Sequence, residues 1–190
     1  MQEVAVLVKL RIAPEDVPRV REYRAKNVKV QKSTSGFRSM TVWQSQVDAT
    51  SYLLIVGYAD DAAAEEGLRA SLDAGGLVAS LNRVETAPEV RRGAVVFHHG
   101  KQPPQVPVGS YASLSVRVAE PGRGRELQSE LSRIFGELSL IDGYLGSAVC
   151  ASETLSEEAV GLVFWHNPQA FQMSLPNKAL YDVAFYRRTI

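Results

Sequence analysis

The sequence contains the same order of secondary-structure elements twice, and this repetition constrains its fold more than any single motif does. An ungapped offset of 107 residues places Gly36 on Gly143 and Tyr58 on Trp165. Few of the paired residues are identical, so the order of the elements carries the comparison. A repeat of this kind indicates a structural unit that the chain uses more than once.

Each copy begins with a strand in which apolar residues recur at every second position, as expected for a strand with one buried face. We align these two strands with an offset of 108, which pairs Val4, Val6, Val8 and Leu10 with Ala112, Leu114, Val116 and Val118. A helix is predicted after each strand. The helix of the second copy has an apolar stripe formed by Leu127, Leu131, Ile134, Phe135 and Leu138.

A hairpin, a second helix and a final strand complete each copy. The hairpin strands are predicted at residues 37–47 and 52–58, and at 144–152 and 159–166. Asp60 or Asp61 caps the second helix of the first copy, and Asn167 caps that of the second copy. The final strands are predicted at 94–98 and 183–187, and an insertion at 77–89 precedes the first of them.

The repeat divides the chain into a first unit at residues 1–98, a linker at 99–109 and a second unit at 110–190. Three prolines and two glycines between residues 100 and 109 are typical of an extended linker. A four-stranded sheet with both helices on one face needs cover for its other face. We therefore predict an α+β fold of tandem ferredoxin-like βαββαβ units, packed sheet-to-sheet as an intrachain dimeric α+β barrel, with further homo-oligomerisation left open.

Composition argues against several classes of partner. The 21 Lys and Arg residues balance 21 Asp and Glu residues, which does not favour nucleic-acid binding. No stretch approaches the roughly 20 apolar residues of a membrane span, and the first residues do not resemble a signal peptide. We therefore expect a cytoplasmic protein that binds neither nucleic acid nor membranes.

Metal binding and disulfides are not expected either. Cys150 is the only cysteine, which excludes an internal disulfide and a cysteine-based zinc site. The adjacent histidines His98 and His99 would point to opposite faces of a strand, so they cannot easily bind one metal ion.

Two stretches of the second copy carry a family resemblance. Residues 143–147 begin a strand with a glycine and an aromatic residue, and residues 159–171 form an apolar strand that ends in Trp165 before a polar cap and an aromatic residue. In these features the chain resembles the antibiotic biosynthesis monooxygenase-like family of the dimeric α+β barrel superfamily. The first copy matches this pattern more loosely, through Gly36-Phe37 and residues 56–63.

The resemblance implies a cleft between the sheet and the helices of one unit. In the quinone-forming members of the family, such a cleft holds a phenolic substrate that reacts with dioxygen without metal, flavin or haem. The resemblance therefore implies a small aromatic substrate, dioxygen as co-substrate and no cofactor. Trp165 matches the family's cleft tryptophan, whereas Phe171 and Gly161 stand where those enzymes carry a tyrosine and an asparagine.

Strand alternation selects further candidates for this cleft. Val163 lies on the same strand face as Trp165, while His166 faces the other way but has a titration range suited to a general base. Ser113, Ser115 and Arg117 form a polar face on the first strand of the second copy, where Arg117 can stabilise an anionic oxygen. The predicted catalytic residues are Trp165, His166 and Arg117, and the predicted substrate-binding residues are Phe171, Ser113, Ser115, Val163, Tyr58 and Trp43.

Three functional hypotheses follow, and the second copy is the expected location of an active cleft. The first hypothesis is a cofactor-independent monooxygenase acting on an aromatic or polyketide-like molecule. The second is a non-oxidative polyketide cyclase or isomerase on the same scaffold. The third is a non-catalytic small-molecule-binding protein. The first rests on family analogy, because one fold can host many functions.

Overall fold

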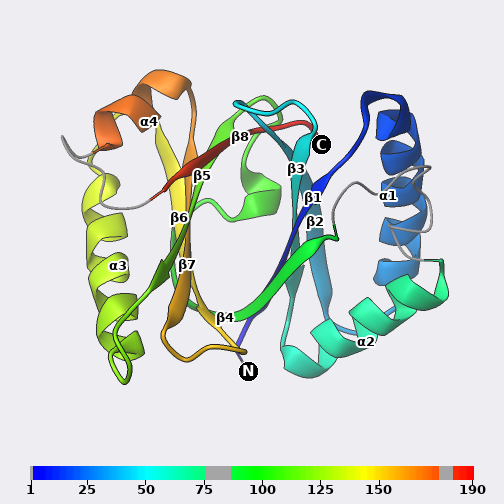
Figure 1. Cartoon of the computed structure of the whole chain (residues 1–190), viewed down its shortest axis with the longest axis horizontal. Helices are drawn as coiled ribbons and strands as arrows, with labels where there is room; N and C mark the ends of the chain where they lie inside the picture. Colours follow the sequence, from blue (N-terminus) through cyan, green and yellow to red (C-terminus); the bar gives the residue numbers. More distant parts are fainter. Residues whose placement is uncertain (1, 76–86, 176–181) are drawn as a thin grey trace.

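A computed structural model describes residues 2–75, 87–175 and 182–190 and shows, within these residues, eight antiparallel strands closed into a barrel between two layers of helices (Figure 1). The first unit contains β1 (Val4–Arg11), α1 (Val17–Lys32), β2 (Phe37–Ser45), β3 (Ser51–Tyr58), α2 (Asp61–Asp73) and β4 (Glu89–Gly100). The second contains β5 (Tyr111–Val118), α3 (Gly124–Leu138), β6 (Tyr144–Ser152), β7 (Glu158–Trp165), α4 (Pro168–Ser174) and β8 (Ala184–Arg188). This architecture confirms the predicted α+β fold and its tandem organisation.

The barrel closes because each unit pairs both edges of its sheet with the other unit. The strand order is β1-β3-β2-β8-β5-β7-β6-β4, so β2 pairs with β8 and β4 pairs with β6. Paired edges leave no unpaired row of backbone donors and acceptors. The two sheets therefore join along their edges as well as packing face to face, which makes the chain an intrachain pseudo-dimer.

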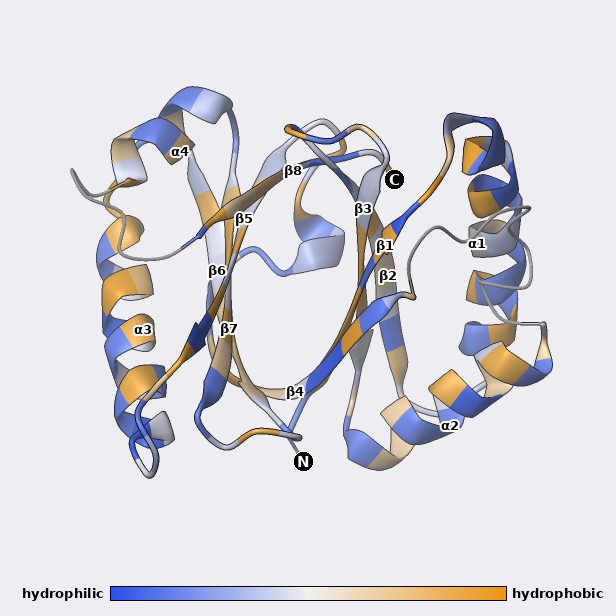
Figure 2. Ribbon diagram, in the orientation of Figure 1, coloured by the Kyte–Doolittle hydropathy of each residue, from blue (hydrophilic) through white to orange (hydrophobic). Residues whose placement is uncertain are grey.

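The barrel interior is an apolar core to which both units contribute. Trp43 of β2 is fully buried there and stacks on Phe164 of β7 with ring centroids 5.5 Å apart. The other side of each sheet packs against its own helices. The helix α3 alternates between hydrophobic and hydrophilic residues along its length, as a helix with one buried face must (Figure 2).

The offset of 107 extends to the first strands, and the predicted offset of 108 there is wrong. Val4 lies opposite Tyr58 in the antiparallel register of β1 and β3, and Tyr111 lies opposite Trp165 in that of β5 and β7. A shift of one residue moves every side chain of a strand to its other face. The polar face of β5 thus faces the helices, whereas Lys9 of β1 faces the barrel.

Most of the predicted local elements are confirmed, with changes at their ends. Asp60 and Asn167 cap α2 and α4, each accepting a hydrogen bond of 2.9 Å from the backbone N–H three residues later. The strand β4 is longer than predicted and runs from Glu89 to Gly100, because it pairs with both β1 and β6. Of the predicted insertion, residues 77–86 lie outside the described residues.

The linker packs against one end of the barrel. After the short 3₁₀ helix η3 (Pro103–Gln105), Val106 is buried in the barrel core. The Arg188 guanidinium donates to the carbonyl oxygens of Pro103 at 3.0 Å, Pro104 at 3.3 Å and Val106. The unit boundaries at residues 98 and 110 stay a proposal, and these contacts tie the linker to the second unit.

The equivalent turns before β2 and β6 provide a test of the repeat. Gly36 and Gly143 have φ values of +84° and +87°. A methyl group at Gly36 would lie 2.6 Å from the Ala63 Cβ, and one at Gly143 would lie 2.8 Å from the Ala170 Cβ. Both positions therefore combine a backbone conformation suited to glycine with a close approach to a helix.

We expect Gly36→Ala and Gly143→Ala each to lower the free energy of unfolding by about 1–3 kcal/mol, through backbone strain and the steric clash. Gly136→Ala in α3 is the matched control, since nothing lies within 4 Å of a methyl group there. It should leave stability unchanged or raise it by about 0.5–1 kcal/mol. Urea denaturation measures all three, and equal stability of the three variants would contradict the account.

Candidate functional site

The second unit has a cavity of about 60 Å³ between its sheet and its helices. Strands β5 and β7 form one wall, and α3 and α4 contribute to the other. The predicted site residues that line it are Trp165, Val163, Arg117, Ser113, Ser115 and Phe171. Residues from five different parts of the second unit's sequence thus meet at one place, where polar side chains of β5 face aromatic rings.

The other predicted site residues lie elsewhere. The exposed His166 follows the end of β7, where its backbone N–H donates to the Gly143 carbonyl at 2.7 Å, and it is not part of the cavity lining. Tyr58 occupies the position in the first unit that Trp165 holds in the second. Trp43 lies in the barrel core, on the opposite face of the sheet from Tyr58.

Trp165 is held in place by a polar contact across the two strands. Its indole Nε1–H donates to the Ser113 Oγ at 3.1 Å, and both residues are buried. The ring of Tyr144 packs edge-on against it, with centroids 6.1 Å apart and an interplanar angle of 82°. A buried indole N–H needs such a partner, so the Ser113 hydroxyl fixes the orientation of the tryptophan ring.

Phe135 of α3 fills the space beside Gly161. A methyl group at Gly161 would lie 2.5 Å from the Phe135 Cζ and 2.9 Å from the Ser115 Oγ. The phenyl ring therefore occupies the volume that a larger side chain at residue 161 would need. From the sequence, Phe135 is predicted only as part of an apolar stripe. A glycine on the strand that faces this helix is the feature that could have indicated its position, because glycine leaves room for a large side chain.

The two clefts carry their polar groups on opposite walls. In the second unit these groups lie on the strand wall, and in the first unit they lie on the helix wall. At the offset of 107, the polar set Ser113, Ser115 and Arg117 corresponds to the apolar set Val6, Val8 and Leu10. On the helix wall the apolar pair Ile134 and Leu138 corresponds to the polar pair Asn27 and Gln31. The two clefts have thus diverged in where they place hydrogen-bonding groups.

Tyr58, Gln31 and Gly67 form a closely packed hydrogen-bond network in the first cleft. The Tyr58 hydroxyl donates to the Gln31 Oε1 at 3.1 Å, and the Gln31 Nε2 donates to the Gly67 carbonyl at 2.7 Å. A methyl group at Gly67 would lie 2.4 Å from the Tyr58 Cε1. Burial raises the pKa of Tyr58 to about 12, although the hydrogen bond to Gln31 acts in the opposite direction. This cleft is therefore packed closed around Tyr58.

The described residues offer neither a cluster of metal ligands nor a membrane-spanning helix. Within residues 2–75, 87–175 and 182–190, no cluster of three or more His, Cys, Asp or Glu side chains is arranged to hold a metal ion. Over the same ranges, no helix combines the length and apolar character needed to cross a membrane.

Comparisons with known proteins find a family similarity in the first part of the chain. Residues 3–70 match the model of the antibiotic biosynthesis monooxygenase family. This match covers part of the first unit, which is therefore similar to an antibiotic biosynthesis monooxygenase domain. The match falls on the first unit, although the more extensive motif lies in the second.

Solved structures share the complete tandem fold. A candidate monooxygenase from Fusobacterium nucleatum is 12% identical, with a TM-score of 0.78 over 100% of this chain and 93% of that one. An anthrone oxidase-like protein is 13% identical, with a TM-score of 0.73 over 100% and 92% of the two chains. A candidate monooxygenase from Lactobacillus acidophilus is 13% identical, with a TM-score of 0.71 over 99% and 94%. At these identities the likeness shows the fold alone. No curated protein matches the chain in sequence.

The contact between Gly161 and Phe135 gives a direct test of the packing in the second cleft. We expect Gly161→Ala to lower the free energy of unfolding by about 1–3 kcal/mol, because its methyl group would overlap the Phe135 ring. In a Phe135→Leu background the same substitution should cost less. Urea denaturation of the four proteins of this cycle measures the coupling, and strictly additive costs would show that the ring does not fill this space.

The raised pKa of Tyr58 implies that the stability of the protein depends on pH in the alkaline range. The folded-state pKa of about 12 exceeds the ordinary tyrosine pKa of 10.0, so the unfolded chain loses this proton first. The free energy of unfolding should therefore fall as pH rises from about 10 to about 12. Tyr58→Phe should make this fall shallower in denaturation experiments across that range, whereas an unchanged slope would exclude a buried, neutral Tyr58.

Proposed function

We propose that the protein is a cofactor-independent monooxygenase that binds a small aromatic molecule in the helix–sheet cleft of its second unit. The observation that carries this proposal is the polar stripe of Ser113, Ser115 and Arg117 beside the rings of Trp165 and Phe171. An apolar, aromatic site with a few convergent polar groups is typical of small-molecule binding. The family of the first unit supports a monooxygenase-like activity.

The proposed reaction uses the chemistry of the substrate rather than a prosthetic group. Arg117 would stabilise the anion of a phenolic substrate and so lower the pKa of its acidic proton. The electron-rich carbon of that anion would then react with dioxygen. For a methylene carbon the balance is CH₂ plus O₂ giving C=O plus H₂O, with all four electrons supplied by the substrate carbon. The aromatic walls would exclude bulk water from the intermediate.

The cleft of the second unit must enlarge before it can hold an aromatic substrate. Its volume of about 60 Å³ is far below the roughly 300–1,000 Å³ of typical ligand pockets. Because the Phe135 ring fills the space over Gly161, substrate binding would require this ring to turn away. Phe135 is therefore the residue that we propose controls access to the cleft.

A non-oxidative cyclase or isomerase is the second candidate function. Residues 161 and 171, a glycine and a phenylalanine, favour this alternative. They supply no polar group at the positions where the quinone-forming enzymes have an asparagine and a tyrosine. Such an enzyme would use Arg117 to stabilise an enolate and would not consume oxygen.

Oxygen uptake with an anthrone-type phenol tests the proposal. We expect consumption of dioxygen in step with ketone formation, without an added cofactor and in the presence of a chelator. Arg117→Met should lower kcat/KM about a hundredfold, since it removes a group that stabilises the developing anion. Arg125→Met, at an exposed position of α3, is the matched control and should leave the rate unchanged.

The same assay separates the alternatives. Conversion of the substrate at an equal rate under nitrogen would refute the monooxygenase proposal and support a cyclase or isomerase. Thermal stabilisation by the phenol without any product would leave only a binding function. An unchanged rate in Arg117→Met would remove this arginine from the mechanism.

A further inference from the structure

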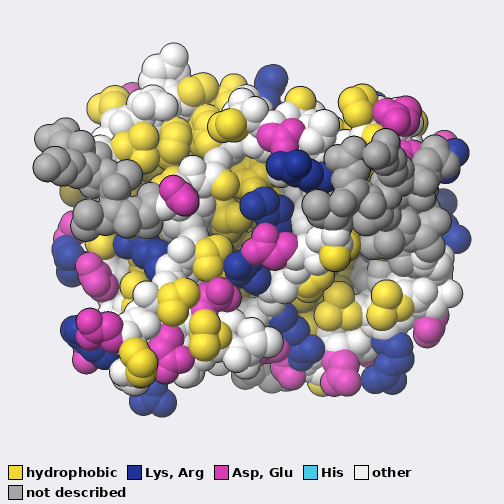
Figure 3. Space-filling view, in the orientation of Figure 1, with side chains coloured by type: hydrophobic (Ala, Val, Ile, Leu, Met, Phe, Trp, Pro, Cys, Tyr) yellow, Lys and Arg dark blue, Asp and Glu magenta, His cyan; other side chains and the backbone are white. Residues whose placement is uncertain are grey.

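Another cavity lies at the end of the barrel that the linker does not cover. This barrel-mouth cavity has a volume of about 620 Å³ and lies where β1 ends and where β3, β4 and β8 begin. The linker residues Pro103 and Pro104 line a different pocket, beside Ala5 near the start of β1. Figure 3 shows charged side chains of both signs around a hollow between the helical layers, with hydrophobic side chains inside it. The volume is in the range of small-molecule sites.

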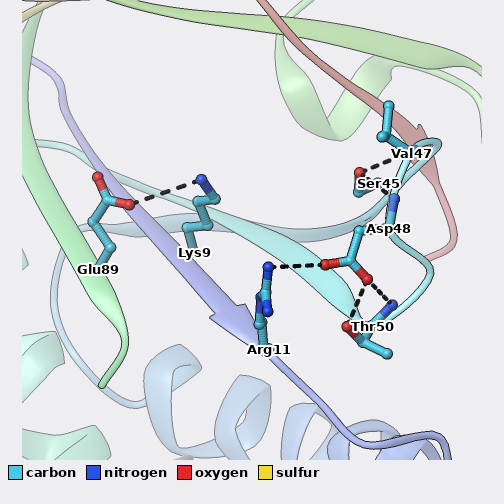
Figure 4. Close-up of polar contacts among 7 residues, drawn as sticks. All are labelled: Lys9, Arg11, Ser45, Val47, Asp48, Thr50 and Glu89. Atoms are coloured by element: carbon cyan, nitrogen blue, oxygen red, sulfur yellow. Dashed lines mark hydrogen bonds and ion pairs between the residues drawn. The ribbon is translucent and has the colours of Figure 1, made fainter. Parts of the chain in front are cut away.

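Two cations project into the barrel mouth from one strand. Lys9 and Arg11 have the same parity along β1 as Ala5 and Leu7, which lie in the barrel core, so they occupy the inner face. Figure 4 shows both side chains extending from β1, Lys9 toward Glu89 and Arg11 toward the turn after β2.

Among the described residues, neither cation is tightly paired. The Lys9 Nζ lies 3.9 Å from the Glu89 Oε2, and the Arg11 Nη2 lies 3.4 Å from the Asp48 Oδ2. Both distances exceed the roughly 2.7–2.9 Å of a charge-assisted hydrogen bond. Both side chains are about half-exposed, so each retains donors for a ligand.

The two carboxylates have closer partners than these cations. Glu89 contacts Arg91 more closely than Lys9, and Arg91 in turn lies 3.5 Å from Glu158. The Asp48 Oδ1 accepts hydrogen bonds from the Thr50 N–H at 3.0 Å and from the Thr50 hydroxyl at 2.6 Å. The carboxylates of Glu89 and Asp48 are thus held mainly by other groups, and within the described part of the chain Lys9 and Arg11 are loosely paired.

The fold itself does not require these cations. At the offset of 107, Val116 and Val118 of β5 occupy the positions of Lys9 and Arg11. The second unit therefore has uncharged valines at these strand positions, and Val116 packs against the barrel core. Two basic residues in the first unit point to a role other than packing.

The remaining lining suits an acid with an apolar body. Ala184 presents apolar surface, and the buried Tyr186 lines the cavity behind it. Ser45 adds a hydroxyl group, whereas the side chain of Ser51 is hydrogen-bonded to Tyr186. The Ser45 Oγ accepts from the Val47 and Asp48 N–H groups at 3.2 Å each, so its own O–H remains a donor. The nearby carboxylates would repel a multiply charged anion more than a single carboxylate.

We propose that the barrel mouth is a binding site for a small aromatic carboxylate, whose acid group contacts Lys9 and Arg11 and whose ring lies against Ala184 and Tyr186. This site is separate from the helix–sheet cleft of the second unit. It does not depend on the activity proposed for that cleft.

Calorimetric titration with naphthoate, and with naphthylmethanol as a neutral analogue, tests the site. Naphthoate should bind the full chain, and naphthylmethanol should bind about tenfold more weakly or not at all. Lys9→Met and Arg11→Met should each weaken naphthoate binding about tenfold, through loss of one charge-assisted contact. Arg69→Met, at an exposed position of α2, is the matched control and should bind like the unchanged protein.

A variant with tighter binding and a salt titration keep the test independent of folding defects. Glu89→Gln should tighten naphthoate binding several-fold, because it removes a carboxylate that competes for Lys9. Added salt should weaken binding to the unchanged protein. Arg117→Met separates the two sites, since it should leave naphthoate binding intact.

Several outcomes would overturn the proposal. One is no binding of naphthoate to the unchanged protein, and another is equal binding of the neutral analogue. A loss of binding in Arg117→Met, with none in the folded Lys9→Met and Arg11→Met variants, would place the acid in the cleft and refute a site at the barrel mouth.

Discussion

Burial of two apolar sheet faces against each other is the constraint on which the rest of this structure depends. Each unit covers one face of its sheet with its own helices, and only the other unit can cover the second face. The stack of Trp43 on Phe164 lies at the centre of this interface. Because the edge strands also pair between units, the barrel interior serves as a structural core, and the cavities described above lie in an outer cleft and at the barrel ends.

Duplication has allowed the two units to place polar groups differently on one scaffold. The first cleft has them on α1, where Gln31 accepts a hydrogen bond from Tyr58 of β3 and donates one to the Gly67 carbonyl. The second has them on a strand, where Ser113 orients Trp165 and Arg117 lines a small cavity. A buried polar network that is fully packed rigidifies a unit. We therefore assign the structural role to the first cleft and the proposed chemistry to the second.

The order of elements, both helix caps and the tandem fold could be predicted from the sequence because they depend on local patterns. The register of β1 could not, since both of its faces are apolar over much of its length and alternation then does not identify the inner one. The filling of the second cleft by Phe135 depends on a contact between residues far apart in the sequence. The barrel mouth likewise forms only when strands of both units meet around Lys9 and Arg11.

Differential scanning calorimetry of the full chain tests the central claim that the two units form one cooperative barrel. If they share a single core, unfolding should occur in one transition whose calorimetric enthalpy equals its van't Hoff enthalpy. Two resolved transitions, or a calorimetric enthalpy well above the van't Hoff value, would show that the units unfold separately and would contradict this account.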